Sequence, residues 1–158
     1  MDRYELVEKL LRLGPSYEVR SGGAVRYKVK GSLLWEKPKL SLRDARSGEV
    51  LAVLRGNAVR TRFDVKDPSG RVLAKLSFPL LGLERRFEME VGNVTFDAEG
   101  AFLGGDFACR GKGGGVVLAI KKKKLSLRNK LVIETSAAVS PEVAVLAAVA
   151  VDQKFFAD

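Results

Sequence analysis

The sequence predicts a mainly β fold, a closed antiparallel barrel of about twelve strands around a buried C-terminal helix. Three observations predict it: an apolar helix near the C-terminus, a long region in which apolar residues alternate with polar ones, and turn residues at short intervals. Many short strands with regular turns are typical of a sandwich or a barrel. A helix that needs burial on every side favours the barrel, because closure makes a lumen that can hold it.

The predicted central helix spans residues 140–153. Ser140 is a good N-cap, Pro141 suits the first helical position, and Glu142 lies where the helix dipole favours an anion. Every residue from 143 to 151 is apolar, so the helix has no face for water and must be wrapped on all sides. It is too short to span a bilayer, which needs roughly 20 apolar residues.

Residues 17–136 are predicted to form the barrel strands. Apolar side chains alternate with polar ones here, as in Val25, Tyr27 and Val29 against Arg26, Lys28 and Lys30. Half-buried antiparallel strands have this pattern. A weak internal repeat supports hairpins, because residues 44–54 are echoed by residues 67–76 and less clearly by 113–120. Each unit has a polar strand end, a glycine turn and an apolar strand.

Residues 1–14 are predicted to form an amphipathic helix outside the barrel. Apolar residues recur there at helical spacing, Asp2 can cap the start, and Gly14-Pro15 can stop the helix. This helix could pack on the domain or lie on a membrane, and we favour packing.

Composition indicates one domain, residues 1–158, that is not an enzyme. The chain has no histidine, which removes the commonest general base and most zinc sites, so we expect no catalytic residues, no metal and no cofactor. The single cysteine, Cys109, excludes an internal disulfide, and the charged N-terminus is unlike a signal peptide, so we expect a cytoplasmic protein. Few Asn, Gln, Cys and Met residues favour a thermophilic source.

The formal net charge of +9 favours anionic partners: lipid headgroups, nucleic acid or acidic proteins. The alternative is that the charge only keeps the protein soluble. Nucleic-acid binding is less favoured, because the aromatic residues fall on the apolar sides of their strands. We expect a monomer.

The densest charge is the lysine cluster, which consists of Lys121, Lys122, Lys123, Lys124, Arg128 and Lys130. A strand that continued through it would send its lysines to both faces. We therefore favour a strand that ends near Ile120, with the lysines splayed at the barrel rim. A bound anion would relieve their repulsion. The alternative is a solvated rim that discourages edge association.

Other candidate sites have simpler structural interpretations. We interpret two arginine groups as solvated strand faces: Arg55, Arg60 and Arg62, and Arg85 with Arg86. Gly111 to Gly115 lacks the phosphate-loop pattern and fits a hairpin turn. Cys109 fits a buried thiol. Trp35 could anchor the protein to a membrane or a partner, or cap the barrel.

The pattern Asp-x-x-Ser-Gly-x-Val-Leu-Ala at residues 44–52, an apolar strand ending in Lys121-Lys122-Lys123, and the apolar helix closing on Asp152 resemble the Tubby C-terminal-like superfamily. Its most similar branches are the LURP-one-related proteins and the phospholipid scramblases. The resemblance covers roughly residues 17–152 and implies the same barrel around a buried helix. Tubby domains bind phosphoinositide headgroups through surface Lys and Arg.

The resemblance therefore implies a non-enzymatic binding module for anionic phospholipid headgroups or other phosphorylated ligands, held by surface lysines at the membrane periphery. The alternative is a nucleic-acid- or protein-binding scaffold that uses the same basic surface. Lipid scrambling is not implied, because the Pro-rich tail, the cysteine cluster and an acidic calcium loop are missing from the sequence.

Overall fold

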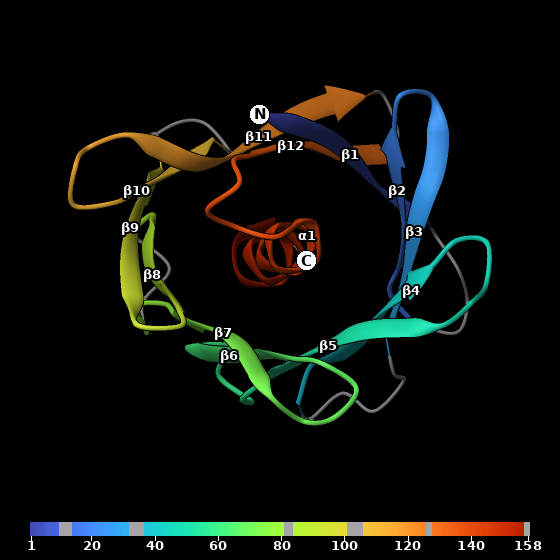
Figure 1. Ribbon diagram of the computed structural model, residues 1–158, viewed down its shortest axis with the longest axis horizontal. Coiled ribbons are helices and arrows are strands. Elements are labelled where there is room, and N and C mark those ends of the chain that lie inside the picture. Colours follow the sequence, from blue (N-terminus) through green and yellow to red (C-terminus); the bar gives the residue numbers. More distant parts are fainter. Residues whose placement is uncertain (10–13, 32–36, 81–83, 101–105, 126–127, 157–158) are drawn as a thin grey trace.

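The computed structural model describes residues 1–9, 14–31, 37–80, 84–100, 106–125 and 128–156. In these residues twelve strands close into one antiparallel barrel around a helix (Figure 1). The strands are β1 (Asp2–Lys9), β2 (Ser16–Ser21), β3 (Ala24–Gly31), β4 (Lys39–Asp44), β5 (Val50–Gly56), β6 (Arg62–Lys66), β7 (Val72–Ser77), β8 (Arg86–Val91), β9 (Val94–Gly100), β10 (Phe107–Arg110), β11 (Val116–Leu125) and β12 (Arg128–Thr135). Each strand pairs with its neighbours in the chain, and β1 also pairs with β12. The predicted closed barrel is confirmed.

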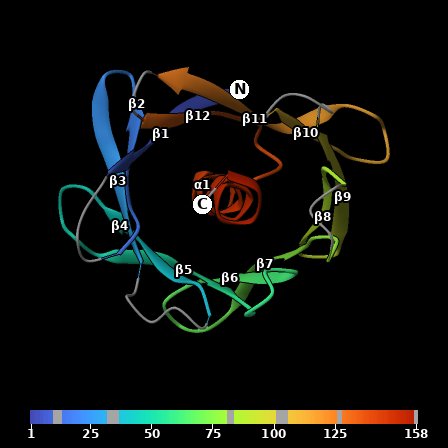
Figure 2. The ribbon, with the colours of Figure 1, turned by 180° about the vertical axis from the view of Figure 1, so that it is seen from behind.

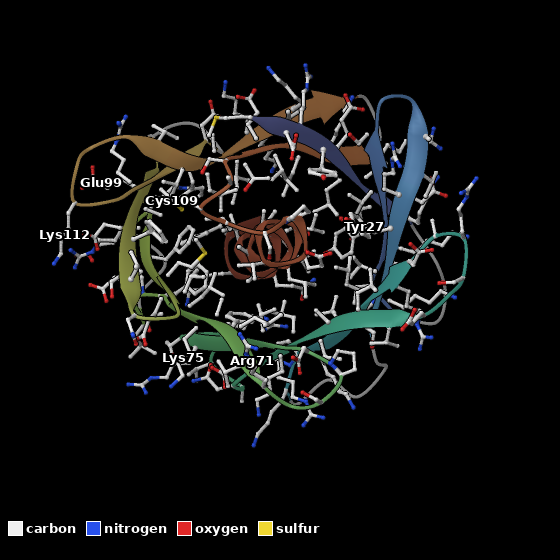
Figure 3. All side chains as sticks on the ribbon, viewed as in Figure 1. Tyr27, Arg71, Lys75, Glu99, Cys109 and Lys112 are labelled. Atoms are coloured by element: carbon white, nitrogen blue, oxygen red, sulfur yellow. The ribbon has the colours of Figure 1, made fainter. Side chains whose placement is uncertain are left out.

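The alternation in sequence separates the lumen from the outer wall. Leu40 and Leu42 of β4 are fully buried, whereas Lys39 and Arg43 of the same strand are exposed. Side chains that follow one another on a strand point to opposite faces, so one set fills the lumen and the other meets water. Figure 3 shows Cys109 inside the wall and Lys75 and Lys112 outside it.

The N-terminal segment is a strand, and the predicted amphipathic helix is wrong. β1 occupies residues 2–9 and fills the space between β12 and β2. Its residues Tyr4 and Leu6 alternate with Arg3, Glu5 and Val7, a pattern that also matches part of a helical repeat. Pairing on both edges decides between the two, because an isolated short helix gains fewer backbone hydrogen bonds and less burial. This segment therefore supplies β1, the strand that closes the barrel between β12 and β2.

The central helix α1 (Pro141–Val151) begins as predicted. The Ser140 hydroxyl accepts a hydrogen bond from the N–H of Val143 at 3.3 Å, and Pro141 takes the first turn. All side chains from 143 to 151 are buried, with exposures of 2 % or less. The barrel therefore encloses the helix on all sides, and the prediction of a wrapped helix is confirmed.

A π-helical turn, η1 (Asp152–Phe156), continues α1 towards one end of the barrel, which we call the C-terminal mouth. Phe155 packs there against Phe78 and Phe107, with ring centroids 5.7 Å and 5.2 Å apart. These contacts join η1 to the residue that follows β7 and to β10, so the helix is held at its end as well as along its sides. Figure 2 shows the helix enclosed by the wall when the barrel is seen from behind.

The repeated sequence units are hairpins, as predicted. Asp44 Oδ1 accepts hydrogen bonds from the N–H groups of Arg46 and Ser47, and Asp67 Oδ1 does the same for Ser69 and Arg71. An aspartate that bonds its own turn sets where the chain reverses. The glycine-rich segment after β10 is also a hairpin turn.

No helix in the described part of the chain is long and apolar enough to cross a bilayer.

Candidate anion-binding surface

The lysine run lies on a continuous strand, so the predicted strand end near Ile120 is wrong. β11 extends to Leu125 and keeps its pairing with β12. Lys121 and Lys123 are exposed, whereas Lys122 is half-buried and follows the inward residues Leu118 and Ile120. The structure thus divides the cluster between the two faces of the wall.

The outward lysines of this cluster have different partners. Lys121 Nζ lies 4.0 Å from Glu134 Oε1, and Lys130 Nζ lies 2.9 Å from Glu5 Oε2. Lys123 faces Lys130 directly across the strand pair, which places two like charges side by side.

The two other members are placed only by register. Lys124 opposes Asn129, and Arg128 opposes Leu125. Their side chains lie outside what the structure describes.

The inward Lys122 is explained by a polar group at the C-terminal mouth. Asp152, only 2 % exposed, accepts a hydrogen bond of 2.7 Å from the hydroxyl of Tyr17. The amide of Gln153 donates to the same hydroxyl at 3.0 Å. Burial raises the pKa of Asp152, while its hydrogen bond with Tyr17 and the charge of Lys122 act in the opposite direction. Lys122 therefore offsets part of the cost of burying a carboxylate.

Glu8 of β1 also belongs to this polar group. Burial raises its pKa, and the nearby charge of Asp152 raises it further. The sequence analysis missed Glu8, Tyr17 and Gln153. The sequence did hold a signal for this polar group, because a lysine that points inward at the end of an apolar strand requires an anion near it.

A basic groove of about 400 Å³ lies on the outer wall where β3 and β4 meet the turn after β4. It is lined by Lys28, Lys30, Arg43 and Arg46, with Asp44 as its acidic residue. Lys28 and Arg43 face each other across the strand pair. Asp44 already accepts hydrogen bonds from the N–H groups of its own turn, which lower its pKa, so its charge is partly engaged. The groove therefore offers several cations to an anion.

One cross-strand row connects this groove with the lysine cluster. Successive register partners run from Lys123 to Lys130, then through Val7 and Glu18 to Lys28, which opposes Arg43. Glu18 bonds Lys9 and Arg20 at 3.5 Å and 3.0 Å. The lysine cluster and the groove thus lie at the two ends of one cross-strand row, with an apolar residue and an acid between them.

Most of the sequence matches a known family. The family model of the LURP-one-related proteins matches residues 3–152. The chain belongs to the LURP-one-related family. The family is part of the Tubby C-terminal-like superfamily, as the resemblance in sequence predicts.

The fold of this LURP-one-related domain is also seen in an X-ray structure of a protein from Arabidopsis thaliana. The two chains are 16 % identical, with a TM-score of 0.60, and the alignment covers 95 % of this chain and 88 % of the other. At this identity the likeness concerns the fold alone. No curated protein matches the sequence.

The charges of the LURP-one-related barrel are unevenly distributed around its wall. The basic wall, as we call the outward residues of β3 to β6, carries Arg26, Lys28, Lys30, Lys39, Arg43, Arg55, Arg62 and Lys66. Asp44 and Asp64 are the acids of this wall. On the far side of α1, β8 and β9 carry Glu88, Glu90, Asp97 and Glu99, with Arg86 as the cation (Figure 1). The barrel therefore presents one basic and one acidic side.

The two arginine groups of the LURP-one-related chain are solvated strand faces only in part. Arg55 and Arg62 are exposed on the basic wall, as expected of solvated strand faces, whereas Arg60 lies in the turn between β5 and β6. Arg86 is paired with Glu84, while Arg85 lies over the ring of Phe155 at 5.7 Å, so it is not a solvated strand residue.

Two single residues, Cys109 and Trp35, are also candidates in the sequence. Cys109 is fully buried, which confirms the prediction of a buried thiol, and this burial raises its pKa to about 12. Trp35 lies outside the described residues. The described residues contain no group of three or more metal-ligating side chains.

Proposed function

We propose that this LURP-one-related domain is a non-enzymatic binding module for anionic phospholipid headgroups or other phosphorylated ligands. It acts in the cytoplasm, at the surface of a membrane, as a monomer. The observation that supports this function is the uneven charge of the wall, with cations gathered on β3 to β6 and acids on β8 and β9. Such a surface is drawn to an anionic bilayer on one side only.

The basic groove supplies the geometry for a phosphate. Arg43 and Arg46 offer planar guanidinium groups that can bind two phosphate oxygens at once, and Lys28 and Lys30 add compact charges. The Arg43 guanidinium already donates to the carbonyl oxygen of Gly48 at 3.2 Å, which holds it towards the turn. The resemblance to Tubby domains, which use surface Lys and Arg for headgroups, supports the ligand class.

The lysine cluster forms the second part of the proposed surface. Lys121, Lys123 and Lys130 are outward, and the like charges of Lys123 and Lys130 oppose each other across the strands, with Glu5 offsetting part of their repulsion. An anion between them would relieve that repulsion. Lys124 and Arg128 belong to the proposal by their position at the end of the same hairpin. Lys122 is left out, because its half-buried side chain acts on Asp152.

A lack of enzymatic activity is supported by the lumen and the composition. Helix α1 fills the interior, where a barrel enzyme would hold its substrate. The sequence has no histidine, and its cysteine thiol is buried with a raised pKa.

The test is co-sedimentation with vesicles of phosphatidylcholine alone and of phosphatidylcholine mixed with phosphatidylserine, at low and near-physiological salt. We expect binding to the mixed vesicles only, retained at the higher salt. The double substitution Lys28→Gln with Arg43→Gln should weaken it, as should Lys121→Gln with Lys123→Gln. Their control is Lys75→Gln with Arg86→Gln, which removes the same charge outside the basic wall.

Equal losses in all three variants would mean that only net charge matters, and an absence of binding to mixed vesicles would refute the proposed function. The alternative partner, nucleic acid, predicts a gel shift that disappears steeply as salt is raised.

A further inference from the structure

The turn between β5 and β6, residues 57–61, is held in one shape at the C-terminal mouth. Asn57 Oδ1 accepts hydrogen bonds from the N–H groups of Thr61 at 2.8 Å and Arg62 at 3.1 Å, and its Nδ2 donates to Thr61 Oγ1 at 2.8 Å. The N–H of Arg60 donates to the carbonyl oxygen of Asn57. A turn with this many internal bonds presents its outer side chains in fixed positions.

Arg60 occupies a backbone conformation that favours glycine. Its φ is +53°, and every other residue with positive φ in the described part of the chain is a glycine. An arginine in this region is strained, because its Cβ approaches the backbone more closely than in the common conformations. Strain of this kind is retained where a side chain has a function. The chain uses glycine at all the other such positions, so the side chain of Arg60 is the feature that needs explaining.

The surroundings of Arg60 are cationic. Burial lowers the pKa of the Lys154 amine, and the nearby charge of Arg60 lowers it further. The Nε of Arg60 is buried and has no acceptor among the described residues. Arg62 and Arg55 are exposed beside it on the basic wall, with Asp64 opposite Arg55. The ion pairs of the described residues include none of these four cations. An anion at this place would be stabilised by several charges together.

Two exposed apolar side chains lie at the same edge. Val59 of the turn is 58 % exposed, and Leu80, which follows β7, is 68 % exposed. Their segments are neighbours, because the N–H of Phe78 donates to the carbonyl oxygen of Thr61 at 2.7 Å. Cations beside apolar residues match a bilayer interface, where headgroup phosphates lie next to acyl chains. A small soluble phosphate would leave Val59 and Leu80 in water.

We infer that the turn of residues 57–61 and Leu80 form the edge by which the domain enters an anionic bilayer, with Arg60 binding a lipid phosphate. This inference rests on the proposed function, because it assumes an anionic membrane as the partner. It adds an orientation: the basic wall, with its groove, lies along the headgroups, and the edge of that wall at the C-terminal mouth enters towards the acyl chains. Val72 and Val94 lie at the opposite end of the barrel, outside the acyl region.

The first experiment compares variants in co-sedimentation with vesicles of phosphatidylcholine mixed with phosphatidylserine. Arg60→Gln should weaken binding about fivefold, as expected for one basic residue at an anionic surface. Val59→Ser with Leu80→Ser should weaken it about tenfold, because less apolar surface enters the interface. The controls are Arg71→Gln and Val94→Ser, which remove the same kinds of side chain from the other end and should bind like the wild type.

Arg60→Gly separates function from structure. Glycine removes the strain at φ +53°, so the melting temperature should stay equal or rise, while binding to the same vesicles falls. A lower melting temperature would mean that Arg60 stabilises the turn, and it would overturn the functional reason for the strain.

A fluorescent label tests insertion directly. Cys109 is buried with a raised pKa, so a cysteine introduced as Val59→Cys can be labelled selectively with an environment-sensitive dye. Its emission should shift to the blue with the mixed vesicles, whereas a label at Val94→Cys should not shift. Two results would overturn this inference and leave the proposed function standing, provided that the wild type binds the vesicles. One is an unshifted emission of the dye at position 59. The other is unchanged binding of the variant with Val59→Ser and Leu80→Ser. A wild type that binds no anionic vesicles would overturn both.

Discussion

The lumen and the outer wall of this barrel are made by the same strands but obey different constraints. In the lumen nearly every position is apolar and fully buried, and the residues around α1 must fit one another in volume. On the wall the same strands carry charges of both signs, separated into a basic and an acidic side. The lumen therefore governs whether the chain folds, and the wall governs what it meets. Substitutions should separate the two, by changing stability in one region and binding in the other.

The largest effect is expected from a charge in the lumen. Ala148→Asp places a carboxylate on the middle of α1, where exposure is 0 %. An unpaired buried charge costs more than about 3 kcal/mol, so cooperative folding should be lost. Circular dichroism during heating would measure this, with Ala24→Asp at an exposed position as the control. A cooperative melt of Ala148→Asp would contradict the burial of the helix.

A smaller loss is expected where a glycine lets an aromatic ring approach the backbone. A Cβ added to Gly56 would lie 2.7 Å from the ring of Phe63, whereas one added to Gly113 would meet nothing within 4 Å. Gly56→Ala should therefore lower the free energy of unfolding by about 2 kcal/mol, as overpacking does. Gly113→Ala should change it little. Urea unfolding of both variants measures the difference, and equal stabilities would show that Phe63 moves aside without cost.

The polar group at the C-terminal mouth should make stability depend on pH. Burial raises the pKa of Asp152 and Glu8 in the folded state, so both bind protons more tightly there than in the unfolded chain. The contribution of these two groups to stability is then greatest below the ordinary carboxyl pKa of about 4, and it falls as pH rises through their folded values. Asp152→Asn removes one of these groups and should flatten that fall. Urea unfolding at several pH values measures the slope, and an unchanged slope would assign the effect elsewhere.

The smallest effect is expected on the outer wall. Lys123→Gln removes the repulsion between Lys123 and Lys130, which should stabilise the fold by about 0.3 kcal/mol at low salt. The gain should vanish at high salt, because salt screens exposed charges. Thermal melts at two salt concentrations test this. A loss of stability at low salt would mean that Lys123 makes a favourable contact instead.

The barrel and its central helix could be predicted from the sequence, but the N-terminal strand could not. The capped, wholly apolar helix and the alternation of Val25, Tyr27 and Val29 with lysines and arginine predicted the barrel and its centre. The N-terminal segment was mistaken for a helix because positions 4, 6 and 7 satisfy both repeats in part. Only its pairing with β12 and β2 decided for a strand.

The placement of the candidate residues on the barrel could not be read from the sequence. A cluster of lysines is visible in any sequence, yet which of them face water depends on where the strand ends, and β11 continues through the run. The groove could not be foreseen as a unit, because Lys28 and Arg43 come together only through strand register.

By itself the sequence determined the fold class, because period-two alternation and an all-apolar helix each leave few ways to bury their side chains. It also determined the excess of positive charge. The tertiary structure alone decided how that charge is arranged, since Lys130 reaches Glu5, and Lys122 reaches Asp152, only after the barrel has closed. The physical reason is that burial is encoded locally in each strand, whereas electrostatic neighbours are set by pairing between strands that lie far apart in the chain.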